Sequence, residues 1–332
     1  MEYHYPKNEM ADHPTTPMPT PDAPKVQSLR LYDVDALEEA VRSSRFEHVQ
    51  VERGEFLAEL KRTDIADLSI SSGCYTQKDI ARGDFPAGCA MLGCVLDCRD
   101  EGWINGYRFH RNDVVVYPKG SELDYIQPAA TNWCAIPLPD GLLEQSGCQQ
   151  ITIDRIRVMP GNWLLTQLIR DLLRNRPDSM AGIACAGSSP PPGKAILLDQ
   201  IRHVLEHYCG DPDVRRPSLQ HRMAMLRKFE DLVRERIAEP LPIVELCSEM
   251  GVSQRVLEYT FKEELGMTPK QYLDLLRLSG LRRELLKGNG VDNPLGQIAG
   301  RYGISHLGRM SDNYRRQFGE LPSETRKRAA TK

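Results

Sequence analysis

The last third of the chain contains one pattern twice, and this internal repeat restricts the possible folds more than any other feature. Residues 246–253 read LCSEMGVS and residues 298–305 read IAGRYGIS, so each copy is a short amphipathic segment closed by a glycine, a β-branched residue and a serine. Apolar residues follow the two copies at matching positions: Leu257, Phe261 and Leu265 after the first, and Met310, Tyr314 and Phe318 after the second. The sequence therefore predicts one supersecondary unit built twice.

Each copy has the chemistry of a helix-turn-helix unit. The glycine supplies the left-handed backbone that ends the first helix, and Ser253 or His306 can cap the free N–H groups of the second. Because the apolar residues of the second helix recur at i, i+4 and i+8, one stripe is buried and the opposite stripe is exposed. Two such units about one domain width apart would suit successive major-groove faces of DNA, which repeat about every 34 Å.

The exposed stripes carry side chains of the types that read base edges or contact phosphates. In the first unit the candidate DNA-binding residues are Ser253, Gln254, Arg255, Glu258, Tyr259 and Lys262. In the second unit they are His306, Leu307, Gly308, Arg309, Ser311, Asp312 and Arg315. Gly308 would let the backbone approach the DNA closely. The alternative is the solvated polar face of an ordinary helical domain, but the tandem arrangement favours DNA binding.

Residues 219–328 resemble the DNA-binding domain of AraC/XylS-type transcription regulators. The matching pieces are GVS at 251–253, LGMTP at 265–269, the helix 271–283, YGI at 302–304, HLGRM at 306–310 and YRRQFGELPS at 314–323. Departures are small: Cys247 and Gly300 stand where the family usually has alanine or similar, and Ile304 replaces a commoner aromatic. The resemblance implies two helix-turn-helix units joined by one long helix, binding to double-stranded promoter DNA, and an activator that works with RNA polymerase.

The residues from about 46 to 139 are typical of short strands. Segments such as 68–71, 91–96 and 114–117 are apolar or alternate, and turn signals separate them. Residues 106–120 resemble the turn pattern of the cupin-like sensor half of AraC-type proteins. The predicted fold class is thus α+β multidomain, with a β-rich cupin-like barrel or sandwich followed by an all-α domain with two helix-turn-helix units.

A sensor of this kind needs an apolar cavity with a few placed polar groups, so we predict a small-molecule effector of unknown identity. The candidate ligand-binding residues are Trp103, Tyr107, Arg108, His110, Tyr117 and Tyr125.

One alternative to a sensor is a cupin-type enzyme fused to a helical DNA-binding or interaction module. Such a metalloenzyme needs several His and a carboxylate, and this region offers only His48 and His110. Another alternative is a barrel that only dimerises. We predict no catalytic residue, no metal and no cofactor.

Composition and the positions of proline-, glycine- and serine-rich segments predict the domain organisation of the chain. We expect a disordered tail at 1–28, a sensor and dimerisation domain at 29–174, a linker rich in proline, glycine and small residues at 175–193, and the DNA-binding domain at 194–332. From residue 211 onward there are 22 Lys and Arg against 17 Asp and Glu, although the whole chain has a net charge of −3. A modestly basic domain joined to an acidic one is the charge layout expected of a DNA-binding regulator.

Three further features bear on assembly and location. Trp163, Leu164, Leu165, Leu168, Ile169 and Leu172 recur at helical spacing, which fits either a helix packed on its own domain or the dimer helix common in this family. His203 and His207 lie four residues apart, but a solvated face is favoured over a metal site because no third ligand is evident. An odd set of nine cysteines without an export signal predicts reduced thiols and a cytoplasmic, non-membrane protein. The resemblance to the family, together with the apolar helix at 163–172, predicts a homodimer.

Overall fold

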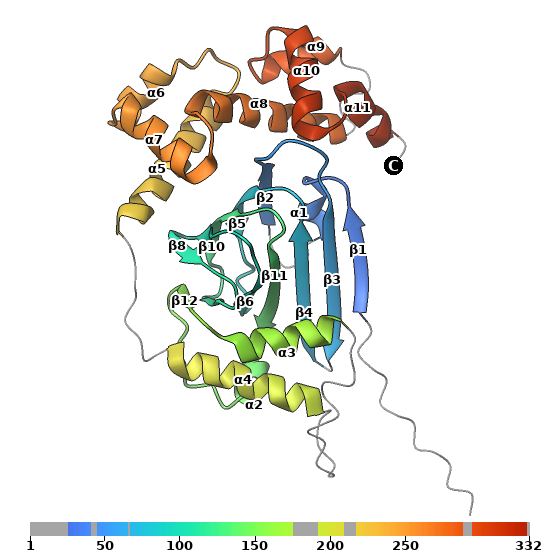
Figure 1. Cartoon of the computed structure of the whole chain (residues 1–332), viewed down its shortest axis with the longest axis vertical. Coiled ribbons are helices and arrows are strands. Elements are labelled where there is room, and N and C mark those ends of the chain that lie inside the picture. Colours follow the sequence, from blue (N-terminus) through green and yellow to red (C-terminus); the bar gives the residue numbers. More distant parts are fainter. Residues whose placement is uncertain are drawn as a thin grey trace, which may run out of the picture.

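The structure, a computed structural model, describes residues 26–40, 45–65, 67–174, 192–208, 217–287 and 294–330. Within these ranges the first part of the chain consists of two sheets with covering helices, and the last part is helical (Figure 1). We call residues 26–208 the β domain and residues 217–330 the helical domain. The predicted fold class, a β-rich domain followed by an all-α domain with two helix-turn-helix units, is confirmed.

The β domain contains two antiparallel sheets. The seven-stranded sheet is ordered β1 (Val26–Leu31), β3 (Ala58–Ile65), β4 (Leu68–Tyr75), β11 (Asn132–Leu138), β6 (Ala90–Asp97), β9 (Val114–Tyr117) and β12 (Arg157–Met159). The five-stranded sheet is ordered β2 (Arg45–Gln50), β5 (Asp79–Asp84), β10 (Glu122–Gln127), β7 (Gly102–Ile104) and β8 (Tyr107–Phe109). Asn105 and Gly106, both at positive φ, make the two-residue hairpin turn between β7 and β8.

The five-stranded sheet is buried on both faces, so it separates the interior of the β domain from the contact with the helical domain. One face contributes Phe46, Ala81 and Leu123 to a core inside the β domain. The other face contributes Val49, Trp103 and Ile126 to a core shared with the helical domain. Because successive side chains of a strand point to opposite faces, β2, β5, β10 and β7 each contribute to both cores.

Four helices accompany the sheets of the β domain: α1 (Ala36–Ala40), α2 (Asp140–Gln145), α3 (Trp163–Leu173) and α4 (Pro192–Tyr208). Helices α3 and α4 pack together at the end of the β domain that is remote from the helical domain (Figure 1). Leu165, Ile169 and Leu172 of α3 and Leu197 and Ile201 of α4 share one core with the seven-stranded sheet.

This packing corrects three expectations about organisation. Helix α4, which we assigned to the DNA-binding domain from residue 194, packs its apolar stripe into the β domain core, because periodicity shows that a stripe is buried but not which partner covers it. Strand β1 begins at Val26, inside the predicted tail 1–28. The proposed dimer stripe of α3 is largely buried in its own domain, which leaves Trp163 (64% exposed) and Leu164 (48% exposed) on the surface. Predicted linker residues 175–191 lie outside the described ranges.

The helical domain consists of α5 (Pro217–Glu235), α6 (Ile243–Met250), α7 (Gln254–Leu265), α8 (Pro269–Leu286), α9 (Leu295–Arg301), α10 (Leu307–Phe318) and α11 (Pro322–Ala330). Helix α8 begins with a capping box between Thr268 and Gln271 and has Pro269 in its first turn, a combination that strongly favours helix initiation. Its first half packs in the core that holds α6 and α7, and its second half in the core that holds α9 and α10. One long helix therefore joins two small helical units.

Candidate nucleic-acid interface and sensor cavity

The first helix-turn-helix unit consists of α6 and α7. Helix α6 ends at Gly251, whose φ of 68° is the left-handed conformation that reverses the chain, and the side chain of Ser253 accepts a hydrogen bond from the backbone N–H of Val256. Leu257, Phe261 and Leu265 form the buried stripe of α7. The local geometry predicted for this unit is confirmed in the turn, the cap and the stripe.

The second unit consists of α9 and α10, with Gly303 at a φ of 67° in the turn. Met310, Tyr314 and Phe318 are buried as predicted, and the Tyr314 hydroxyl lies 2.8 Å from the Thr325 hydroxyl of α11. The predicted cap at His306 is wrong, because its side chain makes no capping hydrogen bond. His306 does occupy the N-cap position, with φ −110° and ψ 90°. A side chain that can accept a hydrogen bond is therefore present at this position, but it makes no bond to the first N–H groups of α10.

The capping difference gives a direct prediction. Ser253→Ala is expected to lower the free energy of unfolding by about 1 kcal/mol, since it leaves an N–H group at the start of α7 without its partner. His306→Ala, with no cap bond to lose, is expected to stay within about 0.5 kcal/mol of the wild type. Urea denaturation of both variants would measure this, and equal losses would contradict the assignment.

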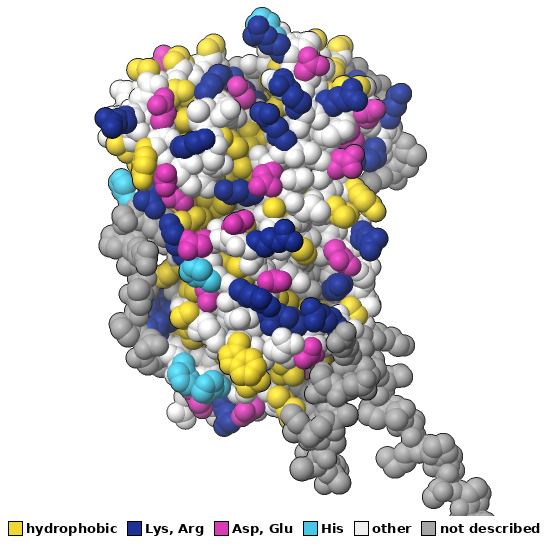
Figure 2. Space-filling view, viewed as in Figure 1, with side chains coloured by type: hydrophobic (Ala, Val, Ile, Leu, Met, Phe, Trp, Pro, Cys, Tyr) yellow, Lys and Arg dark blue, Asp and Glu magenta, His cyan; other side chains and the backbone are white. Residues whose placement is uncertain are grey.

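The candidate DNA-binding residues lie on the surface of the helical domain. Gln254, Arg255, Glu258, Tyr259 and Lys262 of α7 are all exposed. In the second unit His306, Leu307, Gly308, Arg309, Asp312 and Arg315 are exposed, and Ser311 is half-buried with its hydroxyl donating to the Leu307 carbonyl at 3.1 Å. Figure 2 shows Lys and Arg interspersed with acidic side chains over both domains on this face, so no single basic patch dominates it.

The outer face of the five-stranded sheet is the surface on which the helical domain docks. Val49, Ile80, Ile126 and Trp103 lie in one row across β2, β5, β10 and β7, since each is paired with the next in register. This row packs in the same core as Phe229 and the stripe of α7. The first helix-turn-helix unit thus rests on an apolar band of the β domain.

Ion pairs flank that apolar band. Arg234 lies 2.6 Å from Glu47 of β2, and Arg283 of α8 contacts the same carboxylate. Farther along the sheet Arg82 contacts Asp231, and Asp124 contacts Arg227. In each pair one partner comes from each domain, so the contacts fix the register of the docked domains.

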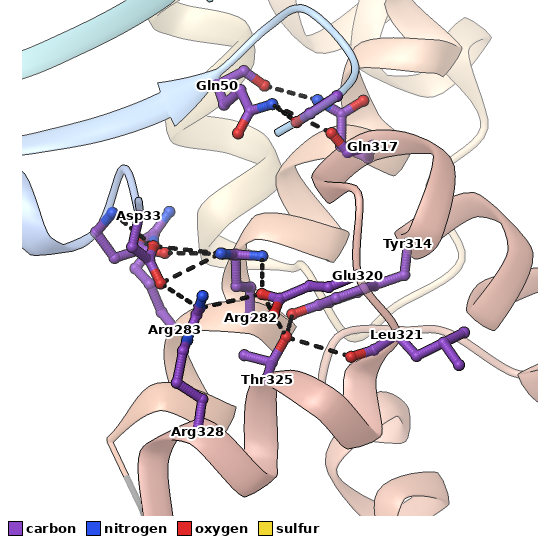
Figure 3. Close-up of polar contacts among 12 residues, drawn as sticks. Asp33, Gln50, Arg282, Arg283, Tyr314, Gln317, Glu320, Leu321, Thr325 and Arg328 are labelled. Atoms are coloured by element: carbon purple, nitrogen blue, oxygen red, sulfur yellow. Dashed lines mark hydrogen bonds and ion pairs between the residues drawn. The ribbon is translucent and has the colours of Figure 1, made fainter. Parts of the chain in front are cut away.

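A second set of polar contacts holds the other end of the helical domain (Figure 3). Arg282 of α8, whose side chain is 4% exposed, lies 3.2 Å from Asp33 of the β domain and 2.9 Å from Glu320. The buried Gln317 side chain of α10 donates to the Gln50 carbonyl at 2.9 Å, and the Gln50 amide donates to the Gln317 carbonyl at 3.2 Å. Both helix-turn-helix units are therefore attached to the β domain.

The β domain holds a cavity of about 570 Å³ between its two sheets. Its lining is rich in aromatic side chains, including Phe46, Tyr75, Phe85, Tyr117, Tyr125 and Trp133. Gly73 makes room for this arrangement, because a Cβ there would lie 2.6 Å from the Trp133 ring. The volume is within the range of about 300–1,000 Å³ typical of small-molecule sites.

A buried polar cluster lies beside this cavity. His48 Nδ1 lies 2.8 Å from Asp79 Oδ2, and the Tyr125 hydroxyl donates to the same oxygen at 3.3 Å. Burial raises the pKa of the Asp79 carboxyl, while the neighbouring His48 lowers it. The carboxyl is fully buried, so its partners in the cluster hold it in one orientation.

The cavity contains two of the six predicted ligand-binding residues, Tyr117 and Tyr125. The other four expectations are corrected: Trp103 packs against the helical domain, and Tyr107, Arg108 and His110 do not line the cavity. Arg108 and His110 instead contact the exposed Glu101. Sequence reasoning missed Phe46, His48, Tyr75 and Gln127, and residues 45–50 (RFEHVQ) show no alternation of apolar and polar residues that would have indicated which face of β2 lines a cavity.

The described residues bear on the enzyme alternative and on membrane insertion. His48 and His110 are not brought together, and no group of three or more His, Cys, Asp or Glu side chains within the described ranges could hold a metal ion. His203 and His207 stack with ring centroids 4.2 Å apart on α4. None of the described helices has the length and apolar character needed to cross a membrane.

The helical domain contains two pairs of helices, and α8 connects the pairs. In each pair a glycine lies in the turn and the second helix exposes a polar face. This arrangement defines a helix-turn-helix protein of the DNA-binding class. Residues 246–328 match a family model described as a helix-turn-helix domain. The helical part of the chain is thus similar to the DNA-binding part of AraC/XylS-type regulators.

Named relatives match part of the chain. The chain is 32% identical over 100 residues to the probable thc operon regulatory protein of Rhodococcus erythropolis. This match covers 30% of this chain and 30% of that protein. It is 29% identical over 146 residues to the XylDLEGF operon transcriptional activator of Pseudomonas putida, or 39% of this chain and 46% of that protein. The match thus spans less than half the length of either relative.

Among solved structures, the similarity covers part of the chain in one case and most of it in another. An AraC-type transcriptional regulator from Chromobacterium violaceum is 32% identical and covers 32% of this chain and 94% of that one, with a TM-score of 0.31. ToxT from Vibrio cholerae, with a bound naphthalenyl butenoic acid, is 10% identical and covers 93% of this chain and 100% of that one, also with a TM-score of 0.31.

Proposed function

We propose that this protein is a sequence-specific DNA-binding transcription regulator whose activity responds to a small molecule bound in the β domain. The observation that carries the proposal is the exposure of the polar faces of α7 and α10 in two helix-turn-helix units joined by α8. The docked β domain leaves these faces uncovered, so both helices are available to duplex DNA. Promoter DNA and RNA polymerase are the proposed partners, and transcriptional activation is the proposed output.

We further propose a homodimer. Support comes from the two large apolar side chains that α3 leaves on the surface, Trp163 and Leu164. Their neighbours Leu165 and Ile169 are buried in the β domain, so a dimer contact on α3 would use the outer side of the helix. A dimer would place two helical domains on one promoter and raise the effective concentration of the second.

The five-stranded sheet supports a route from ligand to DNA. In β2, Phe46 and His48 line the cavity, while Glu47 and Val49 contact the helical domain. Gln50, the last residue of the same strand, contacts Gln317 of the second DNA-reading helix. A ligand that shifts β2 would therefore alter how α7 and α10 are presented, because a single strand contributes to both surfaces.

The central test is a gel-shift titration of the full-length chain on duplex promoter DNA. We expect a complex at low salt whose affinity falls steeply as salt rises, since Lys and Arg displace condensed counterions. Absence of any complex at low salt would remove the proposed function.

Base reading gives a sharper prediction. Arg255→Ala and Arg309→Ala are each expected to lose about 1–3 kcal/mol of discrimination between specific and random DNA if these exposed side chains contact base edges. Lys262→Ala is the matched control, because a phosphate contact should weaken binding to all sequences alike. Competition gel shifts would measure the ratio, and equal losses on specific and random DNA would reduce both arginines to phosphate contacts.

A further inference from the structure

One row of polar side chains in the five-stranded sheet reaches the cavity at Gln127. Gln50, Asp79 and Gln127 are paired across β2, β5 and β10, two residues beyond the row His48, Ala81 and Tyr125. Side chains two residues apart on a strand share a face, so both rows lie on the inner side of the sheet. Of this row only Gln127 lines the cavity, beside His48 and Tyr125 of the neighbouring row.

Gln127 is the residue of this row whose side-chain amide has an unused hydrogen-bond donor. Its side chain lines the cavity and the residue is only 5% exposed, yet its amide nitrogen has no hydrogen-bond partner among the described residues. A buried donor without a partner costs about 1–3 kcal/mol, and a ligand oxygen placed against it would remove that cost. The Gln127 amide therefore favours a ligand that presents a hydrogen-bond acceptor.

The rest of the lining favours a flat apolar body. Phe46 packs edge-on against Phe85 with ring centroids 5.3 Å apart, and Tyr75 packs edge-on against Trp133 at 6.2 Å. Met91 and Leu123 are also in the lining. Rings that line a cavity in this way bind a planar apolar group through large contact area and edge-to-face packing.

The charges of the lining disfavour an anion. The buried imidazole of His48 is already paired with Asp79. Lys61 and Arg62 of β3 also line the cavity, but their side chains are partly exposed, and they pair with Glu59 and Asp64 at 3.6 Å and 3.5 Å. A carboxylate at the Gln127 end would meet the Asp79 carboxyl rather than a free cation, and desolvating an uncompensated charge is expensive.

From these observations, and resting on the proposed function, we infer that the effector is an uncharged, planar, largely aromatic molecule with a carbonyl-type oxygen. The oxygen accepts a hydrogen bond from the Gln127 amide, and the ring system lies among the aromatic side chains. Anionic analogues of the same shape are excluded by their charge rather than their size.

The test uses coumarin, a planar neutral lactone, and coumarin-3-carboxylate, which keeps the ring system and adds a negative charge. Binding of each to the full-length chain without DNA is measured by isothermal calorimetry and by thermal shift. We expect coumarin to bind the wild type at least about tenfold more tightly than the carboxylate. Gln127→Leu, which keeps the side-chain size but removes the donor, is expected to weaken coumarin binding about tenfold, the loss of one hydrogen bond.

Two control variants distinguish a lost ligand contact from a folding defect, and the absence of DNA from the assay keeps the result independent of the proposed function. Gln145→Leu makes the same chemical change on exposed α2 and is expected to leave coumarin binding unchanged. Gln127→Glu, nearly isosteric, should lose coumarin binding like Gln127→Leu even if the leucine variant folds poorly. Because the assay contains no DNA, coumarin binding with a failed gel shift would remove the regulator function and leave the ligand class standing.

Several outcomes would overturn the ligand class. Equal or tighter binding of the carboxylate, lost on replacement of Lys61 or Arg62, would identify an anion site instead. Unchanged coumarin affinity in both Gln127 variants would remove the proposed contact. Absence of coumarin binding up to its solubility limit would show that the cavity does not accept this class.

Discussion

Arg282→Met is expected to lower the free energy of unfolding by about 3–5 kcal/mol, one of the two largest effects we predict. The guanidinium is buried between Asp33 of the β domain and Glu320, and it lies over the Phe318 ring at 4.6 Å. Burial alone would lower the pKa of Arg282, but the surrounding carboxylates, Asp33 first, raise it above its usual value. Removing this charge leaves Asp33 and Glu320 with Arg328 as their remaining cation, and it removes the buried partner that lies between the two carboxylates.

Denaturant unfolding of the full-length chain at neutral pH would measure the loss. Arg316→Met is a suitable control, since Arg316 is exposed on α10 and contacts Asn313 of the same helix. We expect the control to stay within about 0.5 kcal/mol of the wild type. A similarly small change for Arg282→Met would mean that the buried network does not contribute to the stability of the docked domains.

The second large effect is a dependence of stability on pH at Asp35. Burial, followed by repulsion from Asp33, raises the pKa of Asp35 to about 7, and Arg283, Arg282 and His48 oppose that rise. Because this folded-state pKa exceeds the ordinary aspartate pKa of 3.8, the folded chain holds a proton that the unfolded chain releases. The stabilisation is present below about pH 4 and is lost as the pH rises toward 7.

Comparison of the wild type with Asp35→Asn isolates this contribution, because asparagine does not ionise. Between pH 5 and 7 the wild type is expected to lose about 3 kcal/mol relative to Asp35→Asn, since each pH unit in this window corresponds to about 1.4 kcal/mol. Asp140→Asn, which alters an exposed pair with Lys119, should follow the wild type across the range. Parallel curves for the wild type and Asp35→Asn would contradict a proton held at Asp35.

The helix-turn-helix units could be predicted from the sequence because their determinants are local. Gly251, Ser253 and the stripe from Leu257 to Leu265 lie within fifteen residues of one another, and the second copy repeats the pattern. Helix period and turn chemistry do not depend on the rest of the fold. The cap at His306 failed because a suitable residue type at an N-cap still needs the right side-chain geometry.

The cavity was harder to predict because strand pairing is not local. His48 and Tyr125 lie 77 residues apart, and only the pairing of β2 with β5 and of β5 with β10 brings them to one face. Trp103 looked like a ligand-binding residue, but its place in the register turns it outward to the helical domain. A single sequence indicates which residues alternate in a strand, and the tertiary pairing decides which partner each face meets.

The alternation along β2 has a consequence for how such a protein can evolve. Positions 46 and 48 face the ligand cavity, whereas positions 47 and 49 face the helical domain. Substitutions at the two sets can accumulate separately, so a lineage can acquire a new ligand while the domain contact is preserved. A one-residue insertion or deletion within the strand would exchange the two sets at once. We therefore expect relatives with different ligands to vary in composition at positions 46 and 48 and to keep the length of this strand.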